Sequence, residues 1–339
     1  MTLPSSHPVA VVGAGVVGLT TAVRLLERGT RVAVYAERRS PRITSAAAPA
    51  MFTPYPGSDP RRSRRWAEAS YMAYLDLEKR EGARAGVRTG PLREYCYHPP
   101  KRSVFADLTH ERPAPHIPPN LAAVIDSDRP HIDTSRFLAW LEARAASLGG
   151  VFIDERITSL DALLSRGHRV VVNCSGIGAR ELTGDQSVRA MRGIVLHCRH
   201  LAGLTRSLHD DAPNDVVTYI FRYDNHLVLG STYERNVWEE TIDDGAIKAI
   251  VERCRELARL DNQPGCSEIG RDPIDRRVGL RPVRGPGDMC EDIRLELEPR
   301  KSGAIIHNYG HGRSGISLAW GTANEAADLT LEHLSKSAR

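Results

Sequence analysis

Long apolar runs are missing from this sequence. No stretch of about eighteen consecutive apolar residues occurs, so no membrane-spanning helix is expected. Net charge is also small, because 46 basic residues stand against 42 acidic ones. This balance argues against nucleic-acid binding, and we expect the basic run Arg61, Arg62, Arg64 and Arg65 to be a solvated face. The first apolar segment follows Met1 almost directly, which leaves no room for a signal peptide and favours a cytoplasmic protein.

Cysteine pairs are missing as well. The six cysteines form no C-x-x-C motif and have no histidine companions at metal-ligand spacing. We therefore expect reduced, structural thiols and no metal site. The chain ends at Lys336–Arg339, which is not an S-K-L peroxisomal signal. The cysteines are Cys96, Cys174, Cys198, Cys254, Cys266 and Cys290.

A glycine-rich turn near the N-terminus is the strongest local signal. Val9–Val12 is a short apolar run that is typical of a buried parallel strand. Gly13, Gly15 and Gly18 then complete G-x-G-x-x-G. These glycines permit a tight turn, let a pyrophosphate approach the backbone, and let the next helix pack closely on the sheet. The free amides at the start of that helix can bind the phosphates.

The elements after this turn fit a nucleotide-binding unit. Apolar residues at helical spacing predict a helix over Val16–Arg28, and a second strand follows over Arg31–Tyr35. Glu37 comes nineteen residues after Gly18, where an acid usually accepts hydrogen bonds from a ribose. The adjacent Arg38 is placed to contact a phosphate or adenine. The pattern predicts a bound dinucleotide, and it does not choose between FAD and NAD.

Periodicity places the other elements. The segment 38–60 is expected to be a loop beside the cofactor crevice, with a flexible surface loop as the alternative. Short strands and turns are expected over 95–130. Helices are predicted over Ser63–Glu81, Thr134–Leu148, Asp244–Ala258 and Ser317–Leu334. The first of them is expected to carry an apolar face formed by Trp66, Ala69, Met72, Ala73 and Leu77. Strands are predicted over Val151–Asp154, Val170–Cys174, Gly193–Cys198, Val216–Arg222, His226–Gly230 and Ala304–Asn308.

Arg281 is a candidate ligand-binding residue. It stands between Leu280 and Pro282, in an apolar setting where an unpaired guanidinium would be costly. A planar anion is therefore the expected partner, and a structural salt bridge is the alternative. A second glycine-rich turn, Tyr309–Gly315, opens the last helix, where the amides can face an anion or a reduced flavin.

Together, several blocks of the sequence resemble the FAD-dependent D-amino-acid oxidase family, which includes D-aspartate oxidases, in its microbial form. The similarity extends over nearly the whole chain. The matching blocks are VVGAGVVGL at Val11–Leu19, VYAERRSP at Val34–Pro41, TPY at Thr53–Tyr55, VVNCSGIGA at Val171–Ala179, VGLRPVR at Val278–Arg284, and HNYGHGRSGIS followed by WG at His307–Gly321.

The resemblance implies an α/β fold in which a Rossmann-like FAD-binding domain is interleaved with a mainly antiparallel β substrate-binding domain. We assign residues 1–57, 131–190 and 285–339 to the first domain, and 58–130 and 191–284 to the second. The implied FAD-binding residues are Gly13, Ala14, Gly15, Val16, Val17, Gly18, Glu37, Arg38, Thr44, Ser45, Ala50, Met51, Ser175, Gly176, Gly310, Gly312, Arg313, Ser314, Gly315, Ile316 and Ser317.

The resemblance also implies a reaction. A D-amino acid would transfer a hydride from its α-carbon to FAD N5, with oxygen as the oxidant and 2-oxo acid, ammonia and hydrogen peroxide as products. No catalytic side-chain base is expected, so His307 and His311 are interpreted as shaping the turn. The implied substrate-binding residues are Tyr219, Tyr233, Arg281 and Arg313.

The sequence departs from the better-known mammalian members at two places. Asn214–Thr218 carries no tyrosine that could form a lid, so we expect a less gated entrance. Arg313 replaces a small residue, which favours either acidic substrates or a solvent-facing side chain; a neutral substrate range is preferred. A glycine or sarcosine oxidase, a biosynthetic amine oxidase and an FAD-binding protein without turnover are the alternatives. A homodimer is left open.

Overall fold

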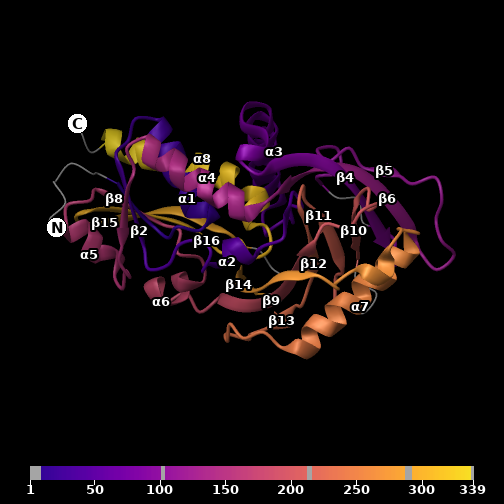
Figure 1. The fold of residues 1–339 in the computed structure, drawn as a ribbon. Helices are drawn as coiled ribbons and strands as arrows, with labels where there is room; N and C mark the ends of the chain where they lie inside the picture. Colours follow the sequence, from indigo (N-terminus) through magenta and orange to yellow (C-terminus); the bar gives the residue numbers. More distant parts are fainter. Residues whose placement is uncertain (1–8, 101–103, 212–215, 287–291, 337–339) are drawn as a thin grey trace.

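The computed structural model describes residues 9–100, 104–211, 216–286 and 292–336. It contains two β-sheets, which occupy the left and right halves of Figure 1. The first sheet has the order β15-β16-β8-β1-β2-β7, and only β15 runs antiparallel to its neighbour. Its strands are β1 (Val9–Val12), β2 (Val32–Ala36), β7 (Val151–Asp154), β8 (Val170–Asn173), β15 (Arg294–Arg300) and β16 (Gly303–Tyr309).

Helices cover both faces of the first sheet because its central strands are apolar on both sides. Helices α1 (Val16–Glu27), α4 (Thr134–Ser147) and α8 (Gly315–Lys336) pack on one face, and α5 (Leu160–Ser165) packs on the other (Figure 1). Strand β1 lies between β2 and β8, so the two strands that pair with it lie on opposite sides of it in the sheet. Such a switch point opens a crevice at the carboxyl ends of the strands.

The second sheet is mainly antiparallel and has the order β13-β9-β12-β11-β10-β4-β6-β3, with β14 paired to β9 and β5 to β6. Among the paired strands of this sheet that the structure describes, only β4 and β10 are parallel. Helix α7 (Asp244–Leu260) packs its apolar face on this sheet. The strands are β3 (Ala50–Met51), β4 (Val87–Cys96), β5 (Arg112–Pro113), β6 (Ala123–Ile132), β9 (Val188–Arg199), β10 (Ser207–Asp210), β11 (Tyr219–Arg222), β12 (His226–Gly230), β13 (Glu234–Arg235) and β14 (Pro273–Arg284).

The paired strands β9 and β14 form a long ribbon that brings the second sheet to the crevice of the first. Leu280 on β14 accepts a hydrogen bond from the Thr44 hydroxyl at 3.2 Å, which joins the ribbon to α2 (Thr44–Ala47). The remaining helices are α3 (Pro60–Glu81) and α6 (Ala179–Thr183), with 3₁₀ turns η1 (Gly82–Arg84), η2 (Gly176–Gly178) and η3 (Cys266–Glu268).

The predicted α/β architecture is confirmed, and three local predictions are wrong. Residues 38–60 are not a continuous loop, because they contain α2 and β3. Residues 95–130 contain turns and the short strand β5, as expected, but the strands β4 and β6 that enter this segment are ten residues long and pair along their whole length. In α3 the expected apolar face is rotated: Met72 is 63% exposed, whereas Tyr74 is buried and donates a hydrogen bond to the Ile316 carbonyl at 2.8 Å.

Several predictions are tested only in part by the described residues. The predicted domain boundaries stay a prediction; β3 of the second sheet lies within the segment 1–57. The five cysteines in the described ranges are unpaired, and Cys290 lies outside them. Part of the lid segment 214–218 and the end of the chain also lie outside. None of the helices in the described residues is long and apolar enough to cross a membrane.

Candidate active site

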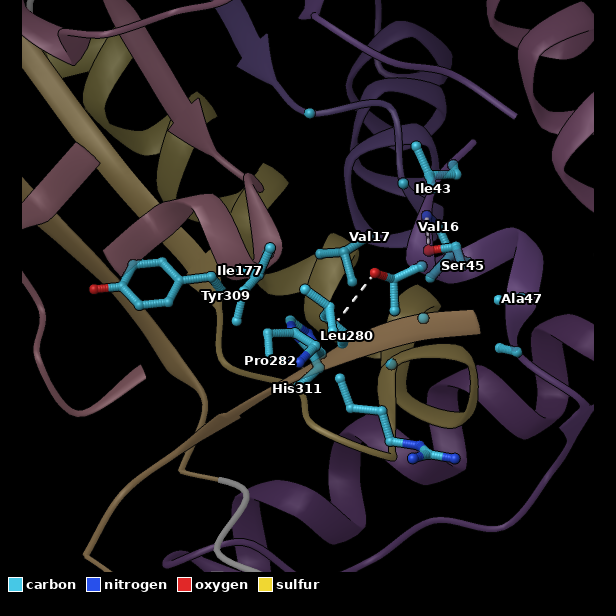
Figure 2. Close-up of a pocket in the computed structure, with 18 of the residues that line it drawn as sticks. Val16, Val17, Ile43, Ser45, Ala47, Ile177, Leu280, Pro282, Tyr309 and His311 are labelled. Carbon is cyan, nitrogen blue, oxygen red and sulfur yellow. Dashed lines mark hydrogen bonds between the residues drawn. The ribbon is translucent and has the colours of Figure 1, made fainter. Parts of the chain in front are cut away.

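A cleft of about 820 Å³ runs from the carboxyl ends of β1, β2 and β8 to the inner face of the second sheet. Its walls come from segments that are far apart in the sequence. Figure 2 shows Val16, Val17 and Ser45 meeting Leu280, Pro282 and His311 around it. Most of the predicted site residues line this cleft; Gly18, Gly310 and Ser314 lie behind its wall.

The glycine motif forms a cradle of backbone at one part of the cleft. Gly13 has φ +108°, and a Cβ there would lie 2.5 Å from the Cys174 carbonyl oxygen. A Cβ on Gly18 would lie 1.9 Å from the Gly13 carbonyl oxygen, so Gly18 is needed for close packing of α1. Helix α1 has no side-chain cap and no acid in its first turn, which leaves its positive end available to an anion. Ser45 Oγ accepts the Val16 N–H at 3.0 Å and lies beside this end (Figure 2).

Charged side chains surround the end of the cleft near β2. Glu37 and Arg38 follow β2 and line the cleft. Glu37 lies 3.9 Å from Arg156, and Arg38 forms an ion pair with Glu240 at 3.1 Å. Ser175 and Gly176 line the same cleft after β8. These positions are compatible with a ribose and a purine.

Arg281 lies at the opposite end of the cleft, on β14. Its guanidinium lies over the Tyr233 ring, 4.6 Å from the centroid. It donates to the Thr232 carbonyl at 3.2 Å and to Ser231 Oγ at 3.4 Å. No acidic side chain among the described residues forms an ion pair with it, so the structural salt bridge considered above is not found there. The geometry leaves a cation that a substrate carboxylate can neutralise.

Tyr219 faces the same end of the cleft. Its side chain is buried and stacks on Phe221, with ring centroids 4.4 Å apart. Its hydroxyl makes no hydrogen bond of normal geometry within the described part of the chain. Burial raises the pKa of this phenol, so the hydroxyl keeps its proton at neutral pH. A buried, unsatisfied hydroxyl in a cleft wall fits a ligand that supplies the missing partner.

Two glycines that sequence reasoning missed make room for these side chains. Gly230 is the cross-strand partner of Tyr219, and a Cβ there would lie 2.2 Å from the Tyr219 hydroxyl. A Cβ on Gly193 would lie 2.2 Å from Arg281 Nη1. The available signal was glycine inside two apolar strands, which often marks a close approach.

The second glycine-rich turn closes the cleft from the side of α8. Gly312 donates its N–H to the Pro282 carbonyl at 3.0 Å. Ser314 Oγ and Ser317 Oγ accept the backbone N–H groups of Tyr55 and Thr53, at 3.0 and 2.9 Å. Two matching blocks of the sequence therefore contact each other. Arg313 lines the cleft and lies over the Tyr55 ring, 3.8 Å from its centroid.

Neither histidine of this region is placed as a general base. His307 is buried in β16, hydrogen-bonded to Glu298 at 2.8 Å, and does not line the cleft. His311 lines it, but its Nε2 is hydrogen-bonded to Thr322 at 3.1 Å. Burial lowers the pKa of His311 to about 3, so its imidazole is neutral at physiological pH and a poor proton acceptor.

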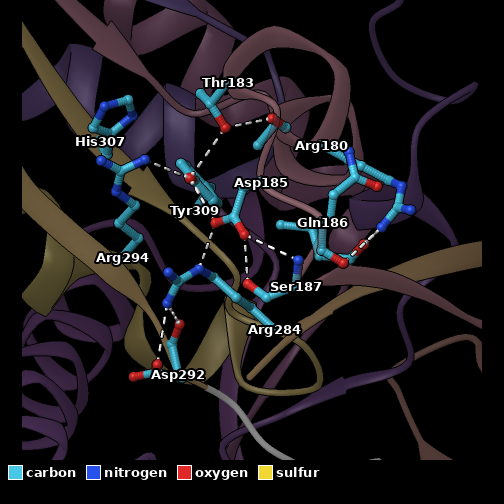
Figure 3. A network of polar contacts seen from close by, with 12 residues as sticks. Arg180, Thr183, Asp185, Gln186, Ser187, Arg284, Asp292, Arg294, His307 and Tyr309 are labelled. Carbon is cyan, nitrogen blue, oxygen red and sulfur yellow. Dashed lines mark hydrogen bonds and ion pairs between the residues drawn. The ribbon is translucent and has the colours of Figure 1, made fainter. Parts of the chain in front are cut away.

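A polar network fixes the strands that hold the second turn (Figure 3). Asp185 accepts hydrogen bonds from Arg284 Nε at 2.7 Å and the Tyr309 hydroxyl at 2.9 Å. Arg284 also donates to the Asp292 carbonyl at 2.9 Å, and Arg294 donates to Tyr309 Oη at 3.0 Å. Burial raises the pKa of Asp185, but the hydrogen bonds that Asp185 accepts from Arg284 and Tyr309 outweigh it and hold the pKa below its usual range. The network links β14, which carries Arg281, to β16, which precedes the turn.

The sequence matches a known family over nearly its full length. A family model described as FAD dependent oxidoreductase matches residues 8–329. The chain belongs to this family. It is 35% identical to a D-amino-acid oxidase of Rubrobacter xylanophilus over 96% of both chains. It is 31% identical to human D-aspartate oxidase, over 96% of this chain and 94% of the relative.

The fold agrees with this family assignment. Glycine oxidase from Geobacillus kaustophilus superposes with a TM-score of 0.77, covering 96% of this chain and 94% of that chain. The sequence identity to it is 20%, so the likeness shows the fold alone. FAD is therefore the cofactor, as the family resemblance implied. The backbone cradle at Gly13, which a Cβ would fill, and the amino end of α1, whose N-cap residue Gly15 has no side chain, fit its pyrophosphate.

Proposed function

We propose that this FAD-dependent enzyme is a D-amino-acid oxidase. The observation that carries the proposal is the Arg281 guanidinium, which has no acidic partner among the described residues and lines the same cleft as the pyrophosphate cradle. In the overall reaction, a D-amino acid, oxygen and water give a 2-oxo acid, ammonia and hydrogen peroxide. Bound FAD supplies the hydride acceptor.

The task of the protein side chains is orientation. Arg281 binds the substrate carboxylate, and the hydroxyls of Tyr219 and Tyr233 donate hydrogen bonds to it. The backbone carbonyl at Arg313 is the proposed acceptor for the substrate amine. No side chain removes a proton from the α-carbon. Apolar residues that line the cleft, such as Met51 and Val195, exclude water from the reacting end.

We expect neutral D-amino acids to be the better substrates. Arg313 already lies over the Tyr55 ring, and Arg222 of β11 does not line the cleft. Neither Arg313 nor Arg222 therefore directs a second positive charge at the substrate side chain. Removing Arg313 should leave the ratio of D-aspartate to D-alanine turnover unchanged. A strong selective loss of D-aspartate or D-glutamate turnover in Arg313→Ala would instead show a preference for acidic substrates.

A peroxide-release assay tests the proposal against the alternatives. The panel contains D-alanine, D-methionine, D-aspartate, L-alanine, glycine and sarcosine at equal concentrations. We expect turnover of the neutral D-amino acids that exceeds turnover of the other compounds. Preferred turnover of glycine or sarcosine would favour the glycine-oxidase alternative, and release from none of them would favour an enzyme with another amine substrate or a protein without turnover. Cytoplasmic localisation is part of the proposal and awaits cell fractionation.

A further inference from the structure

Trp238 is an exposed aromatic residue in the wall of the cleft. Its side chain is 41% exposed, although it lines the cleft together with Glu37 and Arg38. It belongs to the segment 236–243, which follows β13 and leads into α7. An indole that is solvent-accessible beside a ligand cleft is a stacking surface for a planar ring. None of the roles assigned above uses it.

The segment is fixed to the second sheet by Arg192 of β9. Arg192 forms an ion pair with Glu234, and its Nη1 donates to the Glu239 carbonyl at 3.2 Å and to Thr241 Oγ1 at 3.0 Å. The Asn236 N–H also donates to the Ala190 carbonyl, at 2.9 Å. Backbone and side chains of β9 thus hold both ends of the segment, so the position of Trp238 is defined by the fold.

The same segment reaches residues of the first sheet and its helices. Glu240 forms the 3.1 Å ion pair with Arg38, at the end of β2. Arg180 of α6 has its guanidinium 5.6 Å from the centroid of the Trp238 ring. Arg180 is itself held by hydrogen bonds to the Gln186 and Val188 carbonyls, both at 2.8 Å. The segment therefore bridges the cleft wall next to the residues expected at the adenosine moiety.

We propose that Trp238 and Glu240 form an outer wall of the FAD site: the Trp238 indole contacts the adenine base, and Glu240 holds Arg38 beside it. The segment then retains FAD and has no direct part in binding the amino acid. The inference rests on FAD lying in this cleft and does not depend on which amine is oxidised. Failure of the D-amino-acid proposal would leave it intact.

The test measures how fast the purified holoenzyme releases FAD after dilution, from the increase in flavin fluorescence. Trp238→Ala should release FAD about tenfold faster, the size of effect expected for one lost base–aromatic contact, and Trp238→Phe should stay near wild type. Glu240→Gln should show a smaller effect, below about fivefold, because the ion pair is exposed. Added salt should accelerate release from wild type more than from Glu240→Gln.

Ile274→Ala is the matched control, because Ile274 is a 56% exposed apolar residue of β14 that does not line the cleft. We expect it to release FAD at the wild-type rate. The inference is overturned if Trp238→Ala also releases FAD at that rate, or if Ile274→Ala accelerates release equally. On the same preparations, bleaching of the flavin by D-alanine reports separately on the proposed function.

Discussion

The two ends of the cleft are built from different chemical groups of the chain. At the nucleotide end, backbone does the binding: positive φ at Gly13, close packing of Gly18 and the uncapped amino end of α1 form the cradle. At the proposed substrate end, we expect individual side chains to do it: Arg281 has no acidic partner among the described residues, and the Tyr219 hydroxyl has no hydrogen bond of normal geometry there. A substitution at the nucleotide end should abolish FAD binding, whereas a substitution at the substrate end should weaken one interaction with the substrate.

Gly18→Ala is expected to have the largest effect. The new Cβ would lie 1.9 Å from the Gly13 carbonyl oxygen, so α1 must move, at a cost of about 3 kcal/mol or more. We expect protein purified without bound FAD and with a lowered melting temperature. Gly29→Ala is the control: apart from its chain neighbours, no atom of the described residues lies within 4 Å of the added Cβ, and the φ of +79° costs only about 1–2 kcal/mol. Equal FAD content in both variants would contradict the packing role of Gly18.

Arg281→Ala should lower kcat/KM by about a hundredfold or more without loss of FAD, because it removes the charge partner of the substrate carboxylate. Steady-state kinetics and the flavin absorption spectrum measure the two effects. Arg276→Ala is the control on the same strand, since Arg276 pairs with Asp244 on the surface. Loss of FAD from Arg281→Ala would mean that the substrate end and the nucleotide end are not independent. Similar kcat/KM values in both variants would contradict the proposed role of Arg281.

Tyr219→Phe should lower kcat/KM by about tenfold, which is the loss of one hydrogen bond in a desolvated site. Stability should be unchanged or slightly higher, because the Tyr219 hydroxyl makes no hydrogen bond of normal geometry within the described residues. Melting temperature and kinetics together test this pair of expectations. A large drop in melting temperature with unchanged kinetics would assign Tyr219 to the core instead.

At neutral pH the smallest effect is expected at His311, because its protonation changes stability only below about pH 6.5. The folded-state pKa of His311, about 3, is below the ordinary histidine value of 6.5, so the unfolded chain binds more protons between these values. The stability that neutral His311 provides is complete above about pH 6.5 and is lost as the pH falls toward 3. His311→Gln should therefore flatten part of the fall in melting temperature between pH 7 and pH 4. An identical pH profile in both proteins would contradict the assignment.

The nucleotide end was the more predictable from the sequence, because a local motif encodes it. Gly13, Glu37 and the strand–helix–strand order are all within one short segment, and neighbouring residues fold together. The substrate end depends on pairing across the sequence: Gly230 is opposite Tyr219 only once β11 and β12 pair, and Gly193 approaches Arg281 only in the β9–β14 ribbon. Arg281 was still recognisable from its apolar neighbours and the family resemblance.

Other features could not be read from the sequence for the same reason. The segment containing Trp238 carries no motif, and its contacts with Arg38 and Arg180 join residues about 60 to 200 positions apart. Residues 38–60 lack helical period, and α2 forms there because Thr44 and Ser45 bond to Leu280 and Val16. Tertiary contacts determine the structure of these segments, so the periodicity of their sequences does not predict it.

Anaerobic reduction of the bound flavin tests the central claim most directly. The purified holoenzyme is mixed with D-alanine or L-alanine in the absence of oxygen, and its visible absorption is followed. We expect rapid bleaching by the D-enantiomer, little by the L-enantiomer, and recovery of the yellow colour when oxygen is admitted. A protein without flavin absorption, or a flavin that L-alanine bleaches as fast as D-alanine, would contradict the claim.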